Sequence, residues 1–410
     1  MNLKISFSVV MIIYFMLSLT LMIDFLNGFF PMLHIGEIFR ILLLALCSMQ
    51  LISNSINHGL FLISIIIFLI FNIACAEIFG YNSNCIQDIA VAIKSTIVFV
   101  ISSTLILLYK RGKLNFTIEN VLYNNMLYGP LLLIMSSVFG FGVSSYSWDN
   151  SGIGTKGTFL SLNSINVALM ILYMFSIYNV TNLKSKVKWT FFSIYIAVPM
   201  VLLGTKTSFL ILFFAPILFI VLNKDKNNFL KCLIVFFVFI GIAFVFQSYI
   251  LEILEPIISR QLYLMEARDL STYLFSTRNT RVMHIFDLYF SDFTIFEILC
   301  GKVYSVTHFI FGIYDGNVAL PIEMDFVDIF VSYGLIGMIF TYFYSMLIIY
   351  LSEMQCRKGT RFFFWSALVV LIYGTMAGHV FLEAISSTFF AIILAGLYIS
   401  SVDDTHVNNT

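Results

Sequence analysis

Polar residues recur at helical spacing between positions 278 and 291. The residues in question are Arg278, Arg281, His284, Asp287 and Ser291, which are separated by three, three, three and four positions. On a helix these residues form one polar stripe. The guanidinium groups of Arg278 and Arg281 match the oxygens of a phosphate or diphosphate, because each planar fork can bind two oxygens. The stripe is equally typical of a solvated helix face whose charges pair with one another, and the spacing leaves both interpretations open.

The opposite face of this predicted helix is apolar. It carries Val282, Ile285, Phe286, Tyr289, Phe293 and Phe296. Amphipathic helices of this kind lie at the boundary between membrane and water. We therefore expect an amphipathic helix within 278–300 at a membrane surface.

Acidic residues after this segment supply a second kind of chemistry. Asp325 and Asp328 open the next apolar segment, where charges are costly and indicate function. Asp325 and Asp328 also suit a structural role, because negative charge is favourable at the N-terminus of the helix that follows. Both interpretations stay open at this point.

Other charged residues fall at the same ends of the apolar segments. Lys156 and Lys206 stand at predicted loop tips. The same side holds Glu37, Arg40, Glu77, Asp88, Lys94, Asp328, His379 and Glu383. Charges inside a bilayer are costly and indicate function, although snorkelling and helix-to-helix pairing also explain single residues.

The composition identifies the class of protein that must position these residues. Of 410 residues, 60% are hydrophobic and 11% are charged, and the mean hydropathy is +0.97, whereas a soluble domain carries about 25% charged residues. These values exclude a soluble enzyme and a disordered chain. Lys plus Arg equals Asp plus Glu, at 22 each, so the chain has no basic field for nucleic acid. The expected fold class is an all-α, polytopic membrane protein.

Apolar runs predict about twelve transmembrane helices. They lie near 5–23, 35–53, 58–79, 87–109, 120–142, 158–178, 189–204, 206–222, 230–250, 326–350, 362–380 and 385–401. The pair 189–204 and 206–222 is short for two spans and also suits a re-entrant hairpin. Residues 1–250 then hold helices one to nine, 251–322 form one large loop, and 323–410 hold helices ten to twelve and a short tail.

Basic residues orient these helices. Clusters of lysine and arginine stand in the predicted loops near 110–113, 184–188, 224–231 and 357–361. Cytoplasmic loops carry such an excess. Both termini are then cytoplasmic, and the large loop 251–322 lies on the opposite, periplasmic side.

No motif of another enzyme class is present in the sequence. It contains no P-loop, no HExxH and no GxSxG. The six cysteines show neither a CxxC pair nor the spacing of a metal site, so we expect them to pack as thiols, without a disulfide of Cys85 or Cys300.

Four segments in order resemble a known family. They are GTFLSLNSIN at 157–166, GTKTS at 204–208, STRNTR at 276–281 with Gly301 after it, and EMDFVD at 323–328 leading into YGLIG at 333–337. In order and predicted topology they resemble the O-antigen polymerase and ligase superfamily of bacterial surface-polysaccharide synthesis. The resemblance covers roughly residues 155–350.

The resemblance implies a multi-pass glycosyltransferase of the bacterial cytoplasmic (inner) membrane. Its substrate would be an undecaprenyl-diphosphate-linked glycan, with the lipid diphosphate as leaving group, so no nucleotide sugar, metal or other cofactor is expected. Membrane lipid and a chain-length regulator protein are the other partners it implies, and nucleic acid is not one. Arg278 and Arg281, with Lys206 and Lys156 as lesser candidates, would hold the diphosphate. The candidates for orienting or deprotonating the acceptor are Asp325, Glu323 and His284.

Within this superfamily the residues favour a polymerase. Ligases typically show a His-Asn pair shortly before the Gly-Leu-Ile-Gly stretch, where this chain has Glu323-Met-Asp325. The hairpin that often carries Ser-Arg carries Lys206-Thr207 instead. An O-antigen ligase is the alternative, and a lipid-linked oligosaccharide flippase or other transporter is a second one. Twelve spans suit a flippase, but a large outer loop with clustered arginines does not.

Overall fold

The structure is a computed structural model that divides into two compact units, and each is described by itself. The first comprises Met1–Leu17, Ile38–Ile118 and Ser271–Thr410, and the second comprises Ser18–Glu37 and Glu119–Leu270. The structure describes residues 2–79, 81, 83–145, 154–182, 186–222, 255, 259, 262, 266, 278–292, 294–307, 322–353, 361–376 and 378–406.

Helices account for the regular structure of both units. Wholly or mostly in the first unit lie α1 (Asn2–Ser18), α3 (Ile35–Asn54), α4 (Ile56–Ile78), α5 (Cys85–Lys110), α13 (Arg278–Asp292), α14 (Ile295–Cys300), α16 (Asp325–Met338), α17 (Tyr344–Glu353), α18 (Arg361–Met376) and α19 (Ala384–His406). The second holds α2 (Thr20–Phe29), the 3-10 turn η1 (Pro31–Leu33), α6 (Ile118–Val138), α7 (Leu162–Asn182), α8 (Lys186–Leu203) and α9 (Lys206–Leu222). Among the described residues the one extended pairing is an isolated bridge between Ser144 and Thr155.

The fold is that of an all-α, multi-pass membrane protein, as the composition predicts. By length and composition, seven helices of the described residues can cross a membrane: Pro31–Asn54, Ile56–Ile78, Cys85–Lys110, Ile118–Val138, Leu162–Val180, Asp325–Ser352 and Ala384–Val402. A bent pair, Val9–Ser18 with Thr20–Phe29, raises the number to eight if it counts as one span. The predicted count of about twelve is therefore not confirmed.

The difference in count has local causes. The predicted spans 189–204, 206–222 and 362–380 form apolar helices that are shorter than the other spans, and the predicted span 230–250 lies outside the described residues. The predicted first span, 5–23, is two helices that meet at Leu19 with a bend of 60°. Hydropathy reports a continuous apolar run, and it does not report where the helix axis turns.

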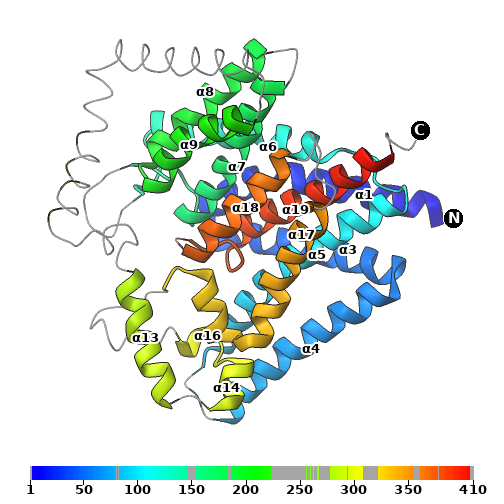
Figure 1. The fold of residues 1–410 in the computed structure, drawn as a ribbon, viewed down its shortest axis with the longest axis vertical. Helices are drawn as coiled ribbons and strands as arrows, with labels where there is room; N and C mark the ends of the chain where they lie inside the picture. The colour runs from blue at the N-terminus through cyan, green and yellow to red at the C-terminus, as the bar shows by residue number, and fades with distance from the viewer. Residues whose placement is uncertain are drawn as a thin grey trace. The chain divides into compact units, whose positions relative to one another are not determined.

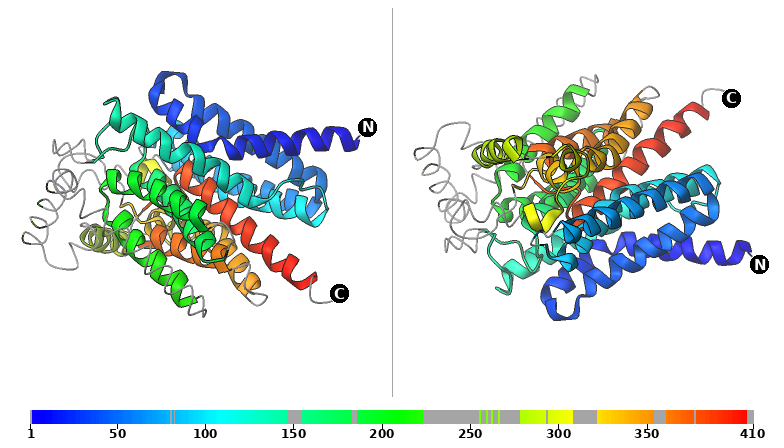
Figure 2. Two further views of the ribbon diagram at one scale, coloured as in Figure 1. Left: turned by 90° about the horizontal axis from the view of Figure 1, so that it is seen from above. Right: turned by 90° about the horizontal axis from the view of Figure 1, so that it is seen from below.

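In the first unit, α5 and α19 form the buried centre and lie side by side (Figure 1 and Figure 2). Both helices are apolar around most of their circumference, which is typical of helices that others enclose. α4 packs on α5, and α17 and α18 pack on α19. These packed helices position the polar residues of the first unit.

The predicted tenth span, 326–350, is broken. Within α16, Gly334 has a φ of +64° and a ψ of −165°, which is not helical. A π-helical turn, Ile339–Phe343, then leads into α17. A break in a membrane helix frees backbone groups that must find other partners.

The segment 294–307 supplies those partners. The N–H groups of Lys302 and Val303 donate to the carbonyls of Val331 and Ser332, each at 3.0 Å. Because these bonds replace helical ones, the non-helical backbone of α16 stays satisfied. The segment that follows α14 is thus part of the support of α16.

The predicted amphipathic helix within 278–300 is present as α13, and α14 follows as a separate helix. Thr294 starts α14 with a capping box in which its side chain and that of Glu297 bind each other's backbone N–H. On α13, Ile285 is buried against Val327 of α16. Part of the apolar face of α13 therefore packs on protein, where the sequence predicted a membrane surface.

Candidate active site

Two of the predicted site residues form an ion pair in the first unit. Arg278 begins α13, and its Nη2 contacts Oε2 of Glu323, two residues before α16. The side chain of Arg278 is 13% exposed and that of Glu323 is 35% exposed, so the carboxylate is the more accessible partner. Among the described residues, Nε of Arg278 has no hydrogen-bond partner. The guanidinium therefore has one buried donor that is unpaired among the described residues.

The backbone at Glu323 is unusual for a residue with a side chain. Its φ is +62°, in the left-handed region, which costs a residue other than glycine roughly 1–2 kcal/mol. The next residue is fixed by Asp328, whose Oδ2 accepts the N–H of Met324 at 3.1 Å. Strained residues cluster at functional sites, where the surrounding structure holds them in place. Glu323 fits that description.

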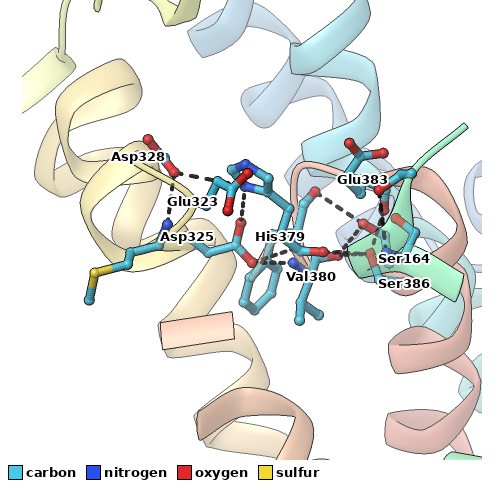
Figure 3. Close-up of polar contacts among 12 residues, drawn as sticks. Ser164, Glu323, Asp325, Asp328, His379, Val380, Glu383 and Ser386 are labelled. Carbon is cyan, nitrogen blue, oxygen red and sulfur yellow. Dashed lines mark hydrogen bonds and ion pairs between the residues drawn. The ribbon is translucent and has the colours of Figure 1, made fainter. Parts of the chain in front are cut away.

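Asp325 is fully buried and binds backbone. Its exposed fraction is 0%. Its Oδ2 accepts the N–H groups of Val380 and of Phe381, the latter at 2.9 Å. These donors belong to the connector 378–383 between α18 and α19 (Figure 3). Asp325 thus ties the start of α16 to this connector. Both aspartates lie in the first turn of α16, where negative charge is favourable, and the N-cap residue is Met324.

His379 lies in the same connector and faces both aspartates (Figure 3). Its Nδ1 is 3.4 Å from Oδ1 of Asp325 and 3.8 Å from Oδ2 of Asp328. His379 is 6% exposed, and its Nε2 has no hydrogen-bond partner within the part of the chain that the structure describes. We call Asp325, Asp328 and His379 the Asp–Asp–His cluster.

The two carboxylates of the Asp–Asp–His cluster affect the pKa of its histidine. Burial lowers the pKa of His379, but the hydrogen bond to Asp325 and the negative charge of Asp328 outweigh burial and raise that pKa to about 9. The two carboxylates therefore favour the protonated form of the imidazole. The ring nitrogen that faces both carboxylates is Nδ1, whereas Nε2 has no hydrogen-bond partner among the described residues.

Tyr304 brings a phenol close to the same carboxylates. Burial raises the pKa of Tyr304, and the charges of Asp328 and Glu383 raise it further, as expected for a hydroxyl near both. Its neighbour Ser305 is anchored to α5, because Asp88 accepts the N–H and the hydroxyl of Ser305 at 2.7 and 2.6 Å. The segment that supports α16 therefore also reaches the candidate site.

Two further predicted residues lie on α13. Arg281 stands one turn after Arg278 and is half-buried. His284 follows one turn later, but its side chain lies outside the described part of the structure. The helix thus carries both arginines on consecutive turns, as their spacing predicts.

The two predicted lysines belong to the second unit. Lys206 is the first residue of α9 and is half-buried. Nζ of Lys156 donates to the carbonyl of Leu160 at 2.9 Å. Their assignment to a diphosphate stays a prediction.

In the second unit, a hydrogen bond connects two of the sequence motifs. The hydroxyl of Ser208, from the segment 204–208, donates to Oδ1 of Asn166, from the segment 157–166, at 2.6 Å. The hydroxyl of Thr205 donates to that of Ser208 at 2.8 Å. The start of α9 is therefore held against α7 through residues that the sequence singled out.

Sequence reasoning did not include His379, Glu383 or Tyr304 among the site residues. For His379 and Glu383 the available signal was their place at the same ends of the apolar segments as the other charges. Tyr304 has no such signal, because a tyrosine near an apolar segment is common at a membrane boundary.

Within the described residues, no group of three or more His, Cys, Asp and Glu side chains is arranged to hold a metal ion. No protein-family model matches the sequence, and no curated protein matches it. We infer the function from the chemistry of the site.

Proposed function

We propose that the chain is a membrane glycosyltransferase that polymerises undecaprenyl-diphosphate-linked repeat units of a bacterial surface polysaccharide. The observation that carries the proposal is the contact between Arg278 and Glu323. It joins a cation suited to a diphosphate with an accessible carboxylate suited to a sugar hydroxyl. In this proposal the site faces the periplasm, where such lipid-linked units are presented.

The reaction uses both members of the pair. The acceptor hydroxyl oxygen attacks the anomeric carbon of the donor sugar, and the bond from that carbon to the diphosphate breaks. Glu323 takes the proton of the hydroxyl, and Arg278 with Arg281 stabilises the charge that grows on the departing diphosphate. Diphosphate oxygens replace Glu323 on the guanidinium, so substrate binding itself frees the base.

The Asp–Asp–His cluster positions this machinery. Asp325 has no exposed surface and two backbone donors, so it is a positioning residue in this proposal. Asp328 fixes the peptide that follows Glu323. Both aspartates keep the base at a defined distance from the guanidinium, which matters because small displacements of reacting groups lower the rate strongly.

Deletion of the protein in its source bacterium tests the assignment. A separate ligase still attaches single units if this chain joins them, so the surface lipopolysaccharide is expected to show core plus one repeat, without a ladder. Bare core, with long polymer accumulating on undecaprenyl diphosphate, identifies a ligase instead. Bare core with single repeat units retained on the cytoplasmic side identifies a flippase.

Complementation of the deletion then tests the site. Glu323→Gln keeps the shape and hydrogen-bonding size of the side chain but cannot take a proton, so we expect it to mimic the deletion at normal abundance. Glu119→Gln, at the exposed start of α6, is the matched control and should restore the ladder. A full ladder from Glu323→Gln removes this residue as the base.

A further inference from the structure

Three cationic side chains stand where α5 ends. Nη2 of Arg111 donates to the carbonyl of Asn54, the last residue of α3, and Nζ of Lys113 donates to Oδ1 of the same Asn54 at 2.9 Å. Lys110 is the last residue of α5, and its Nζ lies 4.8 Å from the ring centre of Tyr398 on α19. We call Lys110, Arg111 and Lys113 the basic cluster.

The side-chain partners of the basic cluster carry no formal charge. They are a backbone carbonyl, a side-chain amide and an aromatic ring. Among the described residues, no carboxylate pairs with any of the three cations. The C-terminal ends of α3 and α5 each supply a partial negative charge of about half an elementary charge, so together they offset about one of the three positive charges. The basic cluster therefore attracts an anion.

The basic cluster lies at the level where two candidate membrane spans end. By length and composition, Asn54 ends one of these spans and Lys110 ends the other. The hydroxyl of Thr104 on α5 donates to the carbonyl of Cys47 on α3 at 3.1 Å. Two turns further along the same two helices, Arg111 contacts Asn54. α3 and α5 therefore run parallel and in register, and both end at the depth of one layer of lipid headgroups.

Exposed apolar side chains adjoin the basic cluster. Ile52, two residues before Asn54, is 54% exposed, and Ile56, the first residue of α4, is 76% exposed. Both belong to candidate membrane spans. An anionic phospholipid matches this combination, because its phosphate contacts the cations while its acyl chains cover the isoleucines. A free phosphate ion matches only the charge.

We propose that the basic cluster binds the headgroup of an anionic phospholipid of the cytoplasmic leaflet. Arg111 and Lys113 each use one N–H group to contact Asn54, so other N–H groups of both side chains can donate to phosphate oxygens. Asn54 holds these two cations in place before the lipid arrives. Basic pockets between membrane helices on the cytoplasmic side bind lipid headgroups in this way. The bound lipid would then tie the end of α3 to the end of α5.

Thermal unfolding of the purified full-length protein in detergent tests the proposal. The protein is titrated with phosphatidylglycerol, or with phosphatidylcholine of the same acyl chains, and the lipid concentration that gives half of the maximal rise in melting temperature is measured. We expect phosphatidylglycerol to act at the lower concentration. Lys110→Gln and Arg111→Gln should each raise that concentration about fivefold, since each cation near the surface contributes about this factor to the binding of anionic lipid. The response to phosphatidylcholine should not change.

Lys188→Gln is the matched control. Lys188 is an exposed cation of α8 on the same predicted side, and its Nζ also has an uncharged aromatic partner, the ring of Tyr123, at 4.6 Å from the ring centre. This variant should respond to phosphatidylglycerol like the unchanged protein. Equal action of the two lipids overturns the proposal, as does a loss in Lys188→Gln that equals the loss in Lys110→Gln. A rise in melting temperature with inorganic phosphate, relative to chloride of equal ionic strength, identifies a free-anion site instead of a lipid site. Lys110→Gln decides the outcome if Arg111→Gln does not fold, because the side chain of Lys110 contacts only a ring among the described residues. The readout does not involve polysaccharide, so it is independent of the glycosyltransferase assignment.

Discussion

The carboxylates of Glu323 and Asp325 stand two residues apart in different surroundings. Asp325 is enclosed and accepts two backbone N–H groups, whereas Glu323 keeps 35% of its side chain exposed and contacts Arg278. A carboxylate that reacts with a sugar must be reached by it. At the scale of single residues, burial therefore separates a group that can react from one that positions.

Substitutions of Arg278 can separate the effect of its charge from the effect of its planar geometry. Arg278→Lys keeps the charge but loses the planar fork, so we expect near-normal abundance and little or no polymer. Arg278→Ala also leaves Glu323 without its partner, which destabilises the protein by about 1 kcal/mol or less, because water can reach the Glu323 carboxylate. Polysaccharide gels and melting of the purified protein in detergent measure the two effects.

An exchange of the two side chains distinguishes chemistry from structure. The double variant Arg278→Glu with Glu323→Arg re-forms the ion pair, so its stability should exceed that of Arg278→Ala while polymer stays absent. Arg361→Lys, at the start of α18, is the control for a loss of fork geometry elsewhere. Full-length polymer from Arg278→Lys contradicts the proposed role in diphosphate binding.

At the scale of elements, α16 and the segment after α14 fit together through two glycines. A Cβ on Gly334 would lie 2.3 Å from backbone atoms of Leu299, and one on Gly301 would lie 2.3 Å from the carbonyl carbon of Ser332. Both residues also have a positive φ, of +64° and +78°. The close approach is what allows the loop N–H groups to reach the open carbonyls of α16.

Substitution of Gly334 tests how much the close packing of these two segments contributes to stability. Gly334→Ala puts a side chain on a backbone conformation that is nearly restricted to glycine, at a cost of about 1–3 kcal/mol, and adds an overpacking cost of about 1–3 kcal/mol. Gly112→Ala is a matched control, because Gly112 has a φ of +63° and no atom within 4 Å of the added Cβ. We expect the melting temperature in detergent to fall further for Gly334→Ala. Equal losses would show that backbone conformation alone matters at Gly334.

At the scale of the whole molecule, the basic clusters predict which loops face the cytoplasm. Reporter fusions after residues 112, 186, 226 and 358 should report the cytoplasm, and fusions near 270 and 310 should report the periplasm, because lysine and arginine are retained on the cytoplasmic side. The paired use of a cytoplasmic and a periplasmic reporter at each site provides the control. A cytoplasmic signal from residues 270 and 310 would contradict the proposed function, since the lipid-linked substrate would be on the other side.

Local pattern was enough for some features of this protein. The apolar composition determined the class of an all-α, multi-pass membrane protein, and the spacing of polar residues determined α13. The sequence also named Arg278, Glu323 and Asp325 as site residues. Each of these inferences depends on which residue types recur within a few turns, and that information is local.

Tertiary structure decided which of these segments contact one another. Arg278 and Glu323 are 45 residues apart, and His379 and Asp325 are 54 apart; no local pattern predicts either contact. The break of α16 at Gly334 likewise depends on a segment more than 25 residues earlier, whose N–H groups satisfy the open carbonyls. Periodicity shows that a helix has an apolar face, or that it carries a charge whose burial costs free energy. Which other segment covers that face, or neutralises that charge, follows only from the packing of the folded chain.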